Sequence, residues 1–293
     1  MLRTVLYTFG FRVTWIIPLR IAYIISDILA ILNCLFNKSS RNYLTGNLRV
    51  IFPDKKKKEI RRMVIKNYMN FGRNLTEMFR MHRTDKHAIA SRTDMDSMKI
   101  LSENRDTYSS YIIATAHFCN WELSAAPLTE ILGKLHSIAL PDPDAGVNTF
   151  YIRARKAIDN YTIPLENASR ICLKRLKEKK TLAILGDRSY TGEGMEMDFF
   201  GKKCLFSTGL ARFALKSNIG VVPYFIIRTG TGRFKALTYE PLRIPEHGSR
   251  NEKVRSILSQ YISILEELIR TYPEFWFAFY PFWEKPPLDA GKP

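Results

Sequence analysis

The sequence predicts an α/β fold: a single domain with a mostly parallel central sheet that is flanked by helices. From Tyr108 onward, short apolar runs alternate with segments of helical periodicity, the order that parallel sheets with helical crossovers produce. No internal repeat or low-complexity linker divides the 293 residues. We therefore expect an N-terminal membrane-anchoring segment over residues 1–40, followed by one folded domain over 41–293.

The apolar runs predict strands, and the periodic segments between them predict helices. Strands are expected at residues 109–115, 135–140, 161–165, 181–186, 220–228 and 233–240. Helices are expected at residues 56–81, 121–132, 148–159, 168–180, 205–217 and 249–270. The last helix begins with a capping box, because Glu252 follows Ser249 by three residues. A polar linker that contains Asn42, Asn47 and Arg49 is expected to lead into the first helix.

The most hydrophobic long stretch is residues 13–36. Arg20 and Asp27 interrupt it, so it is not a clean transmembrane span, and no signal-peptide cleavage site is evident. Arg20, Asp27 and Cys34 are spaced to share one helix face, and the rest is apolar. This pattern predicts a helix that lies in the membrane interface or a tilted anchor. A buried amphipathic helix of a soluble core is the alternative.

The formal net charge of +17 implies a negative partner: nucleic acid, anionic lipid or an acidic carrier protein. Lys55 to Lys58 follow the apolar stretch closely, with Arg61 and Arg62 behind them. Such a run is attracted to the anionic cytoplasmic leaflet by about 1 kcal/mol per charge. We expect contact with an anionic membrane surface, although a solvated loop of lysines has the same composition.

Other classes of protein find less support. Charge alone suggests a nucleic-acid-binding protein, but no helix-turn-helix, zinc-finger or RNA-binding signature is present, so no nucleic acid is expected. No Gly-x-Ser-x-Gly elbow of a serine hydrolase occurs. Cys34, Cys119, Cys172 and Cys204 lack CxxC spacing, which indicates free thiols in a reducing compartment and no metal site. Cys119 is a conceivable nucleophile, but nothing in its surroundings marks an activated thiol.

The strongest candidate for catalysis is His117, which follows the predicted strand 109–115. Open α/β folds place their ligands at that end of a strand. Glu122 comes five residues later, and a carboxylate that holds one ring nitrogen as N–H leaves the other to accept a proton. The pair therefore predicts a general base that activates a hydroxyl. On spacing alone, a purely structural contact between the two side chains is the alternative.

Further candidate stretches lie downstream. Arg153, Arg155 and Lys156 precede a predicted strand and are suited to bind phosphate or to form the solvated face of a helix. Asp187 and Arg188 begin a glycine-rich loop after an apolar strand, a loop that matches no P-loop or dinucleotide fingerprint. Residues 199–203 combine aromatics and lysines that could border an acyl chain and its carrier. The aromatic tail, residues 272–284, is expected to be mostly core.

Together these stretches resemble the lysophospholipid acyltransferase superfamily and, within it, the late acyltransferases of lipid A biosynthesis. The resemblance covers nearly the whole chain and rests on the order of its blocks: Thr115-Ala-His-Phe-Cys-Asn-Trp-Glu122, then Arg155 or Arg153, then Asp187, Phe199-Phe-Gly201 and Val221-Val-Pro223. This sequence differs from the family pattern at two places, both where a substrate would be held. Arg188 stands where the family often has Gln or His, and Pro281 to Trp283 lacks a basic residue.

The resemblance implies a fold like that of glycerol-3-phosphate acyltransferases and an O-acyltransferase at the cytoplasmic face of the bacterial inner membrane. The donor would be an acyl carrier protein or coenzyme A thioester, and the acceptor a hydroxyl of a lipid A precursor in lipopolysaccharide biosynthesis. Other acceptors are a phosphatidylinositol mannoside, a lysophospholipid or an aminolipid. His117 would be the base and Glu122 its orienting partner. Substrate binding would involve Arg155, Arg153, Asn120, Asp187 and Arg188, with no metal and no cofactor.

Overall fold

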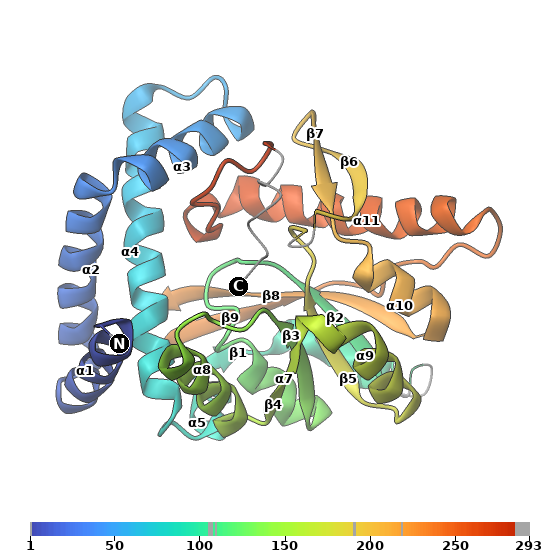
Figure 1. The fold of residues 1–293 in the computed structure, drawn as a ribbon, viewed down its shortest axis with the longest axis horizontal. Coiled ribbons are helices and arrows are strands. Elements are labelled where there is room, and N and C mark those ends of the chain that lie inside the picture. The colour runs from blue at the N-terminus through green and yellow to red at the C-terminus, as the bar shows by residue number, and fades with distance from the viewer. Residues whose placement is uncertain (1, 105–107, 109, 190–191, 218, 285–293) are drawn as a thin grey trace.

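The computed structural model describes residues 2–104, 108, 110–189, 192–217 and 219–284. At its centre lies a seven-stranded sheet (Figure 1). Its strands are β1 (Thr93–Asp94), β2 (Tyr111–Thr115), β3 (Leu135–Ala139), β4 (Asn160–Pro164), β5 (Thr181–Leu185), β8 (Gly220–Gly230) and β9 (Arg233–Thr238). The order is β1-β9-β8-β2-β5-β3-β4, and every neighbouring pair is parallel except β8 and β9. The predicted, mostly parallel α/β sheet is confirmed.

Helices flank this sheet. They are α5 (Lys86–Ala90), α6 (Lys99–Glu103), α7 (Ala125–Leu132), α8 (Ala145–Ala157), α9 (Ala168–Lys177), α10 (Gly209–Ser217) and α11 (Arg250–Thr271). Single 3₁₀ turns are η1 (Asp96–Met98), η2 (Leu165–Asn167) and η3 (Pro273–Phe275). In the view of Figure 1, α11 lies above the sheet, whereas α7 and α8 lie below it. The core is densest around β2 and β8, whose apolar residues are buried on both faces, as in parallel sheets that helices cover.

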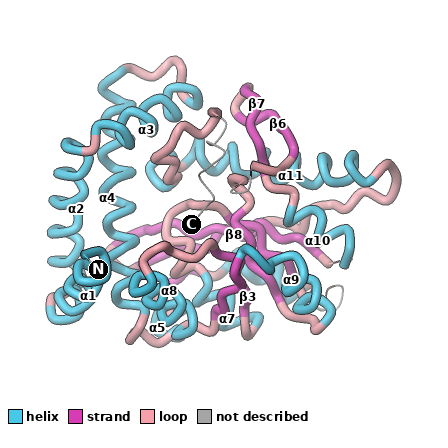
Figure 2. Tube along the Cα trace, viewed as in Figure 1, coloured by secondary structure: helices cyan, strands magenta, loops and turns pink. Residues whose placement is uncertain are grey.

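The predicted capping box of α11 is present. The Ser249 hydroxyl accepts the N–H of Glu252, and the Glu252 carboxylate accepts the N–H of Ser249. Two other boundaries differ from expectation. Helix α7 begins at Ala125 because residues 116–124 form a loop, and α10 begins at Gly209 because Lys202–Phe206 form a strand. That strand, β7, pairs with β6 (Met195–Phe199) in an antiparallel hairpin beside α11 (Figure 2).

The N-terminal part of the chain forms α1 (Leu2–Ile16), α2 (Leu19–Phe36), α3 (Lys38–Ile51) and α4 (Lys57–Met81). The apolar stretch 13–36 is therefore divided between two helices. The division falls at Pro18, which has no N–H and disfavours helical backbone at the residue before it. The expected polar linker is also wrong, because residues 38–51 are helical. Leu44, Leu48 and Ile51 recur at helical spacing and are buried, which explains the helix.

Helix α2 packs along α4 at one edge of the molecule (Figure 1). Arg73 of α4 donates two hydrogen bonds to Asp27 of α2, with N–O distances of 2.8 and 2.6 Å. Gly72 allows the close approach, since a Cβ there would lie 2.7 Å from Ser26 Oγ and 3.2 Å from the Ser26 carbonyl oxygen. Within the described residues, α2 is also the one helix that is long and apolar enough to cross a membrane.

Replacing Gly72 with alanine should lower the free energy of unfolding by about 1 kcal/mol or more, because the added methyl group has no room between α2 and α4. Gly46 is a matched control. It is also helical, no heavy atom lies within 4 Å of where its Cβ would be, and Gly46→Ala should raise stability by up to about 1 kcal/mol. Urea unfolding followed by circular dichroism measures both; equal stabilisation by the two substitutions would contradict this packing.

Candidate active site

His117 and Asp187 meet at the carboxyl ends of two neighbouring parallel strands. Strands β2 and β5 pair in a register that places Thr115 opposite Leu185, and each strand is followed two residues later by one of the two side chains. His117 Nδ1 lies 2.9 Å from Asp187 Oδ1, and the His117 backbone N–H donates to Oδ2 at 3.1 Å. The sheet register itself therefore brings the imidazole and the carboxylate together.

The surroundings of Asp187 favour its ionised form. Burial alone would raise the pKa of Asp187, but the attraction of His117, the hydrogen bonds from it and the charge of Arg188 together lower this pKa below its ordinary value. An ionised carboxylate only accepts hydrogen bonds, so Nδ1 of His117 carries the proton. In the neutral ring, Nε2 is then the basic nitrogen. The imidazole is 18% exposed, whereas the carboxylate behind it is 2% exposed.

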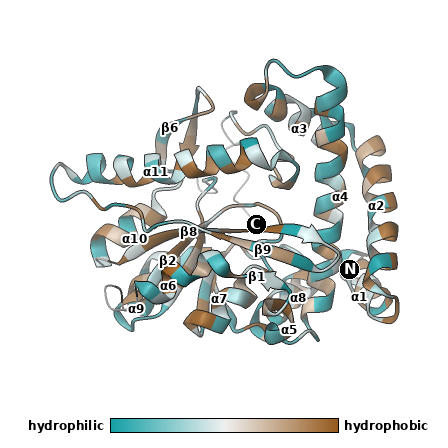
Figure 3. Ribbon diagram, turned by 180° about the vertical axis from the view of Figure 1, so that it is seen from behind, coloured by the Kyte–Doolittle hydropathy of each residue, from teal (hydrophilic) through white to brown (hydrophobic). Residues whose placement is uncertain are grey.

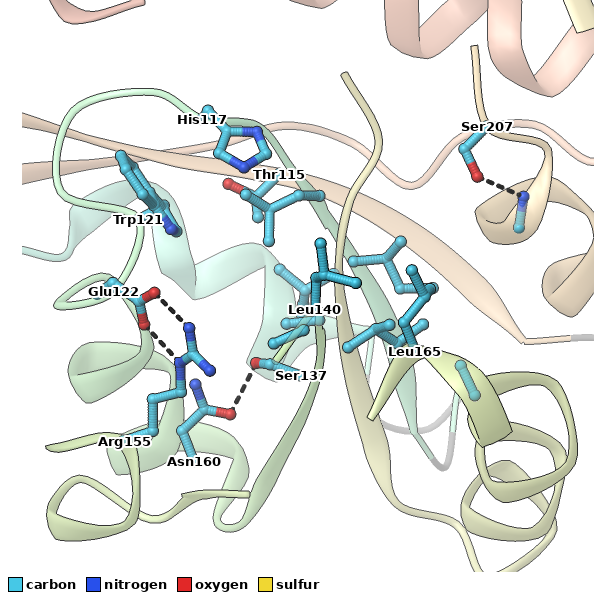
Figure 4. Close-up of a pocket in the computed structure, with 18 of the residues that line it drawn as sticks. Thr115, His117, Trp121, Glu122, Ser137, Leu140, Arg155, Asn160, Leu165 and Ser207 are labelled. Atoms are coloured by element: carbon cyan, nitrogen blue, oxygen red, sulfur yellow. Dashed lines mark hydrogen bonds and ion pairs between the residues drawn. The ribbon is translucent and has the colours of Figure 1, made fainter. Parts of the chain in front are cut away.

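Glu122 does not hold the imidazole, and the predicted His117–Glu122 pair is wrong. The chain after His117 turns through Cys119, which has a φ of 45°, and carries Glu122 toward α8. There Arg155 donates from Nε to Glu122 Oε2 at 2.7 Å and from Nη2 to Oε1 at 2.6 Å (Figure 4). A two-pronged ion pair of this kind has a strong directional preference.

Of the two candidate arginines, only Arg155 belongs to this site. Its guanidinium lies over the ring of Tyr151, at 5.4 Å from the ring centre. Burial alone would lower the pKa of Arg155, but the attraction of Glu122 and the hydrogen bonds to it raise this pKa above its ordinary value. Arg153 is exposed and lines neither of the cavities at His117. The expectation that it contributes to the site is therefore not met.

Two neighbours of His117, Cys119 and Asn120, are buried in the protein. Asn120, a candidate for substrate binding, lines the smaller of the two cavities at His117, but it is buried and its amide bonds to protein groups: Nδ2 donates to Glu77, and Oδ1 accepts the N–H of Leu123. Cys119 is fully buried, and burial raises the pKa of its thiol to about 11. Such a thiol is not an activated nucleophile. All four cysteines are unpaired and buried, as the predicted free thiols require.

Arg188, the second residue of the glycine-rich loop, reaches the site, whereas Asp187 stays behind it. Arg188 lies over the ring of Tyr280, 4.8 Å from its centre, and lines both cavities that adjoin His117. Asp187 lines neither cavity, so its contact is with His117 and not with a substrate. This pairing was not predicted, although both residues had been singled out.

Two cavities meet at His117. The larger, about 690 Å³, extends over the carboxyl ends of β2, β3 and β5 and has both apolar and polar walls, among them Leu128, Leu135, Ser137, Asn160 and Arg212 (Figure 4). The smaller, about 270 Å³, lies against α4 and the aromatic tail, and its walls are mainly apolar: Phe71, Leu75, Met78, Phe277 and Phe279. Both cavities include His117, Trp121, Glu122, Tyr151 and Arg188. His117 is thus accessible from two directions.

Trp121 and Tyr151 were missed by sequence reasoning. Trp121 packs its edge against the His117 ring at 5.3 Å between ring centres, and it occurs inside the block that first drew attention to His117. Tyr151 lies in the run that contains Arg153 and Arg155, four residues before Arg155, so helical spacing alone could have placed it beside that arginine. Within the described ranges, no group of three or more His, Cys, Asp or Glu residues is arranged to hold a metal ion.

Comparison with known proteins adds to this geometry. The profile of the bacterial lipid A biosynthesis acyltransferase family matches residues 1–285. A phosphatidylinositol mannoside acyltransferase of Mycolicibacterium smegmatis is 21% identical over 218 residues, 73% of this chain and 70% of that protein. A protein of the same name from Mycobacterium tuberculosis is 21% identical over 160 residues, 53% of this chain and 51% of that protein. The family match includes every residue of the site described above.

Proposed function

Because this chain belongs to the bacterial lipid A biosynthesis acyltransferase family and is therefore an acyltransferase, we propose that it moves a fatty acyl group from a thioester to a lipid hydroxyl. The observation that carries this proposal is the bond from His117 Nδ1 to Asp187, which leaves Nε2 as the proton acceptor. The donor is an acyl carrier protein or acyl-coenzyme A, and the acceptor is a membrane glycolipid.

The proposed reaction needs no acyl-enzyme intermediate. Nε2 of His117 takes the proton of the acceptor hydroxyl as that oxygen attacks the thioester carbonyl. The new C–O bond forms, the C–S bond breaks, and the departing thiolate takes the proton from the imidazolium. Asp187 stabilises the imidazolium between the two transfers and keeps the ring in one tautomer. Both steps therefore use one proton and one ring nitrogen.

Arginines beside the base are suited to the anionic groups of the reaction. Arg155 and Arg188 line the larger cavity together with His117, and we assign to them the binding of substrate phosphate or of the developing oxyanion. Glu122 holds the Arg155 guanidinium through two of its nitrogens, so its part is to orient Arg155. The second, mainly apolar cavity gives an acyl chain a separate approach to the same base.

Membrane association is supported by an apolar surface on the first two helices. The side of α2 that faces away from α4 exposes large apolar side chains, namely Ile21, Ile24, Ile25, Ile28, Leu29, Leu32, Leu35 and Phe36. The hydropathy colouring of Figure 3 shows the hydrophobic stretches of this helix. Ser26 and Cys34 of the same helix are buried toward the protein. Lys55 to Lys58, Arg61 and Arg62 are exposed basic residues that follow α3 in the chain, at the beginning of α4. We propose that this surface binds the cytoplasmic face of the bacterial inner membrane.

The acceptor is either a lipid A precursor or a phosphatidylinositol mannoside. The family name supports the first, and the names of the curated relatives support the second. Both are glycolipids with hydroxyl groups beside phosphate, which suits a cavity with cationic walls. Mass spectrometry of products from the purified enzyme, offered each acceptor with acyl carrier protein and coenzyme A donors, distinguishes them; failure to acylate either acceptor would refute the proposal.

The proposed mechanism predicts that His117→Ala abolishes measurable acyl transfer and that Asp187→Asn lowers kcat by about 10²–10⁴-fold. The asparagine variant keeps the shape of the side chain but no longer supplies the charge that stabilises the imidazolium. Steady-state kinetics with a fixed donor measures both effects.

The matched control is Asp198→Asn, which makes the same chemical change on the exposed β6–β7 hairpin and should leave kcat unchanged. Wild-type turnover in the His117 or the Asp187 variant would remove that residue from the mechanism.

Replacing Ile24 and Ile28 with aspartate should weaken binding to vesicles of anionic phospholipid, because both side chains lie on the exposed apolar side of α2. Vesicle flotation measures the bound fraction. Ile152→Asp makes the same substitution once, at an exposed isoleucine of α8, and is compared with each single α2 variant; it should leave binding unchanged. Equal binding by all these proteins would contradict the membrane surface.

A further inference from the structure

A buried ion pair lies behind the loop that carries His117. Arg228 of β8 donates from Nε to Glu77 Oε1 at 2.6 Å and from Nη2 to Oε2 at 2.9 Å. Both side chains are 3% exposed. Neither residue lines the cavities at His117, so this pair is not part of the substrate-binding walls.

The pair is surrounded by polar partners that keep both charges in place. Besides Arg228, Glu77 accepts hydrogen bonds from the Tyr23 hydroxyl and from Asn120. Arg228 also donates to Asn70 Oδ1 at 3.0 Å and to Asn74 Oδ1 at 2.5 Å. Burial alone would lower the pKa of Arg228, but the attraction of Glu77 raises it well above the ordinary value. Arg228 therefore stays ionised in the core.

Two asparagines connect this pair to the loop of residues 116–124. Asn120 Nδ2 donates to Glu77 Oε2 at 2.5 Å, and its Oδ1 accepts the N–H of Leu123 at 3.0 Å. Asn74 Nδ2 donates to the carbonyl oxygen of Cys119. Cys119 has left-handed backbone, a conformation that non-glycine residues keep only where neighbouring contacts enforce it. The asparagines supply such contacts from the α4 side.

The C-terminal aromatic segment holds the loop from the other side. The N–H of Phe277 donates to the carbonyl oxygen of His117 at 3.1 Å, and the N–H of Cys119 donates to that of Phe275 at 2.7 Å. His117 and Cys119 are thus both hydrogen-bonded to the C-terminal segment, and Cys119 is also hydrogen-bonded to α4.

We propose that Glu77, with Arg228, Asn74 and Asn120, positions the His117 loop for catalysis. Glu77 and Arg228 act through Asn120 and Asn74, so they are positioning residues that never contact substrate. This inference rests on the proposed function, because it takes His117 as the catalytic base. A buried ion pair adds little net stability compared with apolar residues of similar volume. Stability alone therefore does not explain why the Glu77–Arg228 pair is hydrogen-bonded to this loop.

Asn120→Ala tests the proposal, because it removes the bond to Glu77 and the bond to Leu123. It should lower kcat about tenfold to a hundredfold, the effect expected when a base is displaced by a fraction of an ångström to an ångström, with KM changed less than about twofold. A raised KM with unchanged kcat would instead make Asn120 a substrate-binding residue and overturn the proposal.

The matched control is Ser97→Ala. Like Asn120, Ser97 of η1 donates one hydrogen bond, to the carbonyl oxygen of Ala236 at 2.9 Å, and accepts one, from the N–H of Thr238 at 3.1 Å; both partners belong to β9, near the edge of the sheet. Both variants should lose similar stability in urea, but only Asn120→Ala should lose kcat. Equal loss of kcat in the two variants would reduce the role of Asn120 to stability and overturn the proposal.

If Asn120→Ala does not fold, Tyr23→Phe tests the positioning role of Glu77 instead. It deletes one hydroxyl bonded to Glu77 and should lower kcat severalfold with KM unchanged, whereas an unchanged kcat would overturn the proposal. His117→Ala separates the two levels of inference. Retained turnover in that variant refutes the proposed function; lost turnover there, with wild-type kcat in the Asn120 and Tyr23 variants, refutes only the positioning role.

Discussion

The hydrogen bond between His117 and Asp187 is the interaction on which the account of this acyltransferase depends. It exists because two parallel strands end side by side and each continues for two residues before presenting its side chain. The carboxylate is buried and ionised, and the ring is partly exposed to both cavities. The remaining parts of the site, including the Glu122–Arg155 pair and the loop contacts, are arranged around that imidazole.

Much of the fold follows from local sequence. The runs that became β2, β5 and β8 are mostly apolar, with polar residues only at or near the strand ends, and the capping box marked the start of α11. Helix α3 was missed because its exposed face is strongly polar, which concealed the spacing of Leu44, Leu48 and Ile51. The β6–β7 hairpin was missed because its alternation of exposed and buried residues is short and lies between glycines.

The sequence identified several residues of the site, but it did not predict which of them contact one another. His117 and Asp187 were both noticed because each follows a buried strand, but strand order is a property of the assembled sheet, so their pairing was not visible. Glu122 was assigned by its proximity in sequence, and the turn at Cys119 directs it elsewhere. Asn67, Asn70 and Asn74 offered a signal that was overlooked: amides that recur along the buried face of α4 predict buried hydrogen-bond partners.

The most direct measurement of the central claim is nuclear magnetic resonance of the enzyme labelled with ¹⁵N-histidine. A proton held between Nδ1 of His117 and an ionised carboxylate gives a resonance far downfield of ordinary imidazole protons. The account predicts that this resonance is present in the wild type and in Glu122→Ala and is absent from Asp187→Ala. A resonance that survives loss of Asp187 but disappears with Glu122 would contradict it.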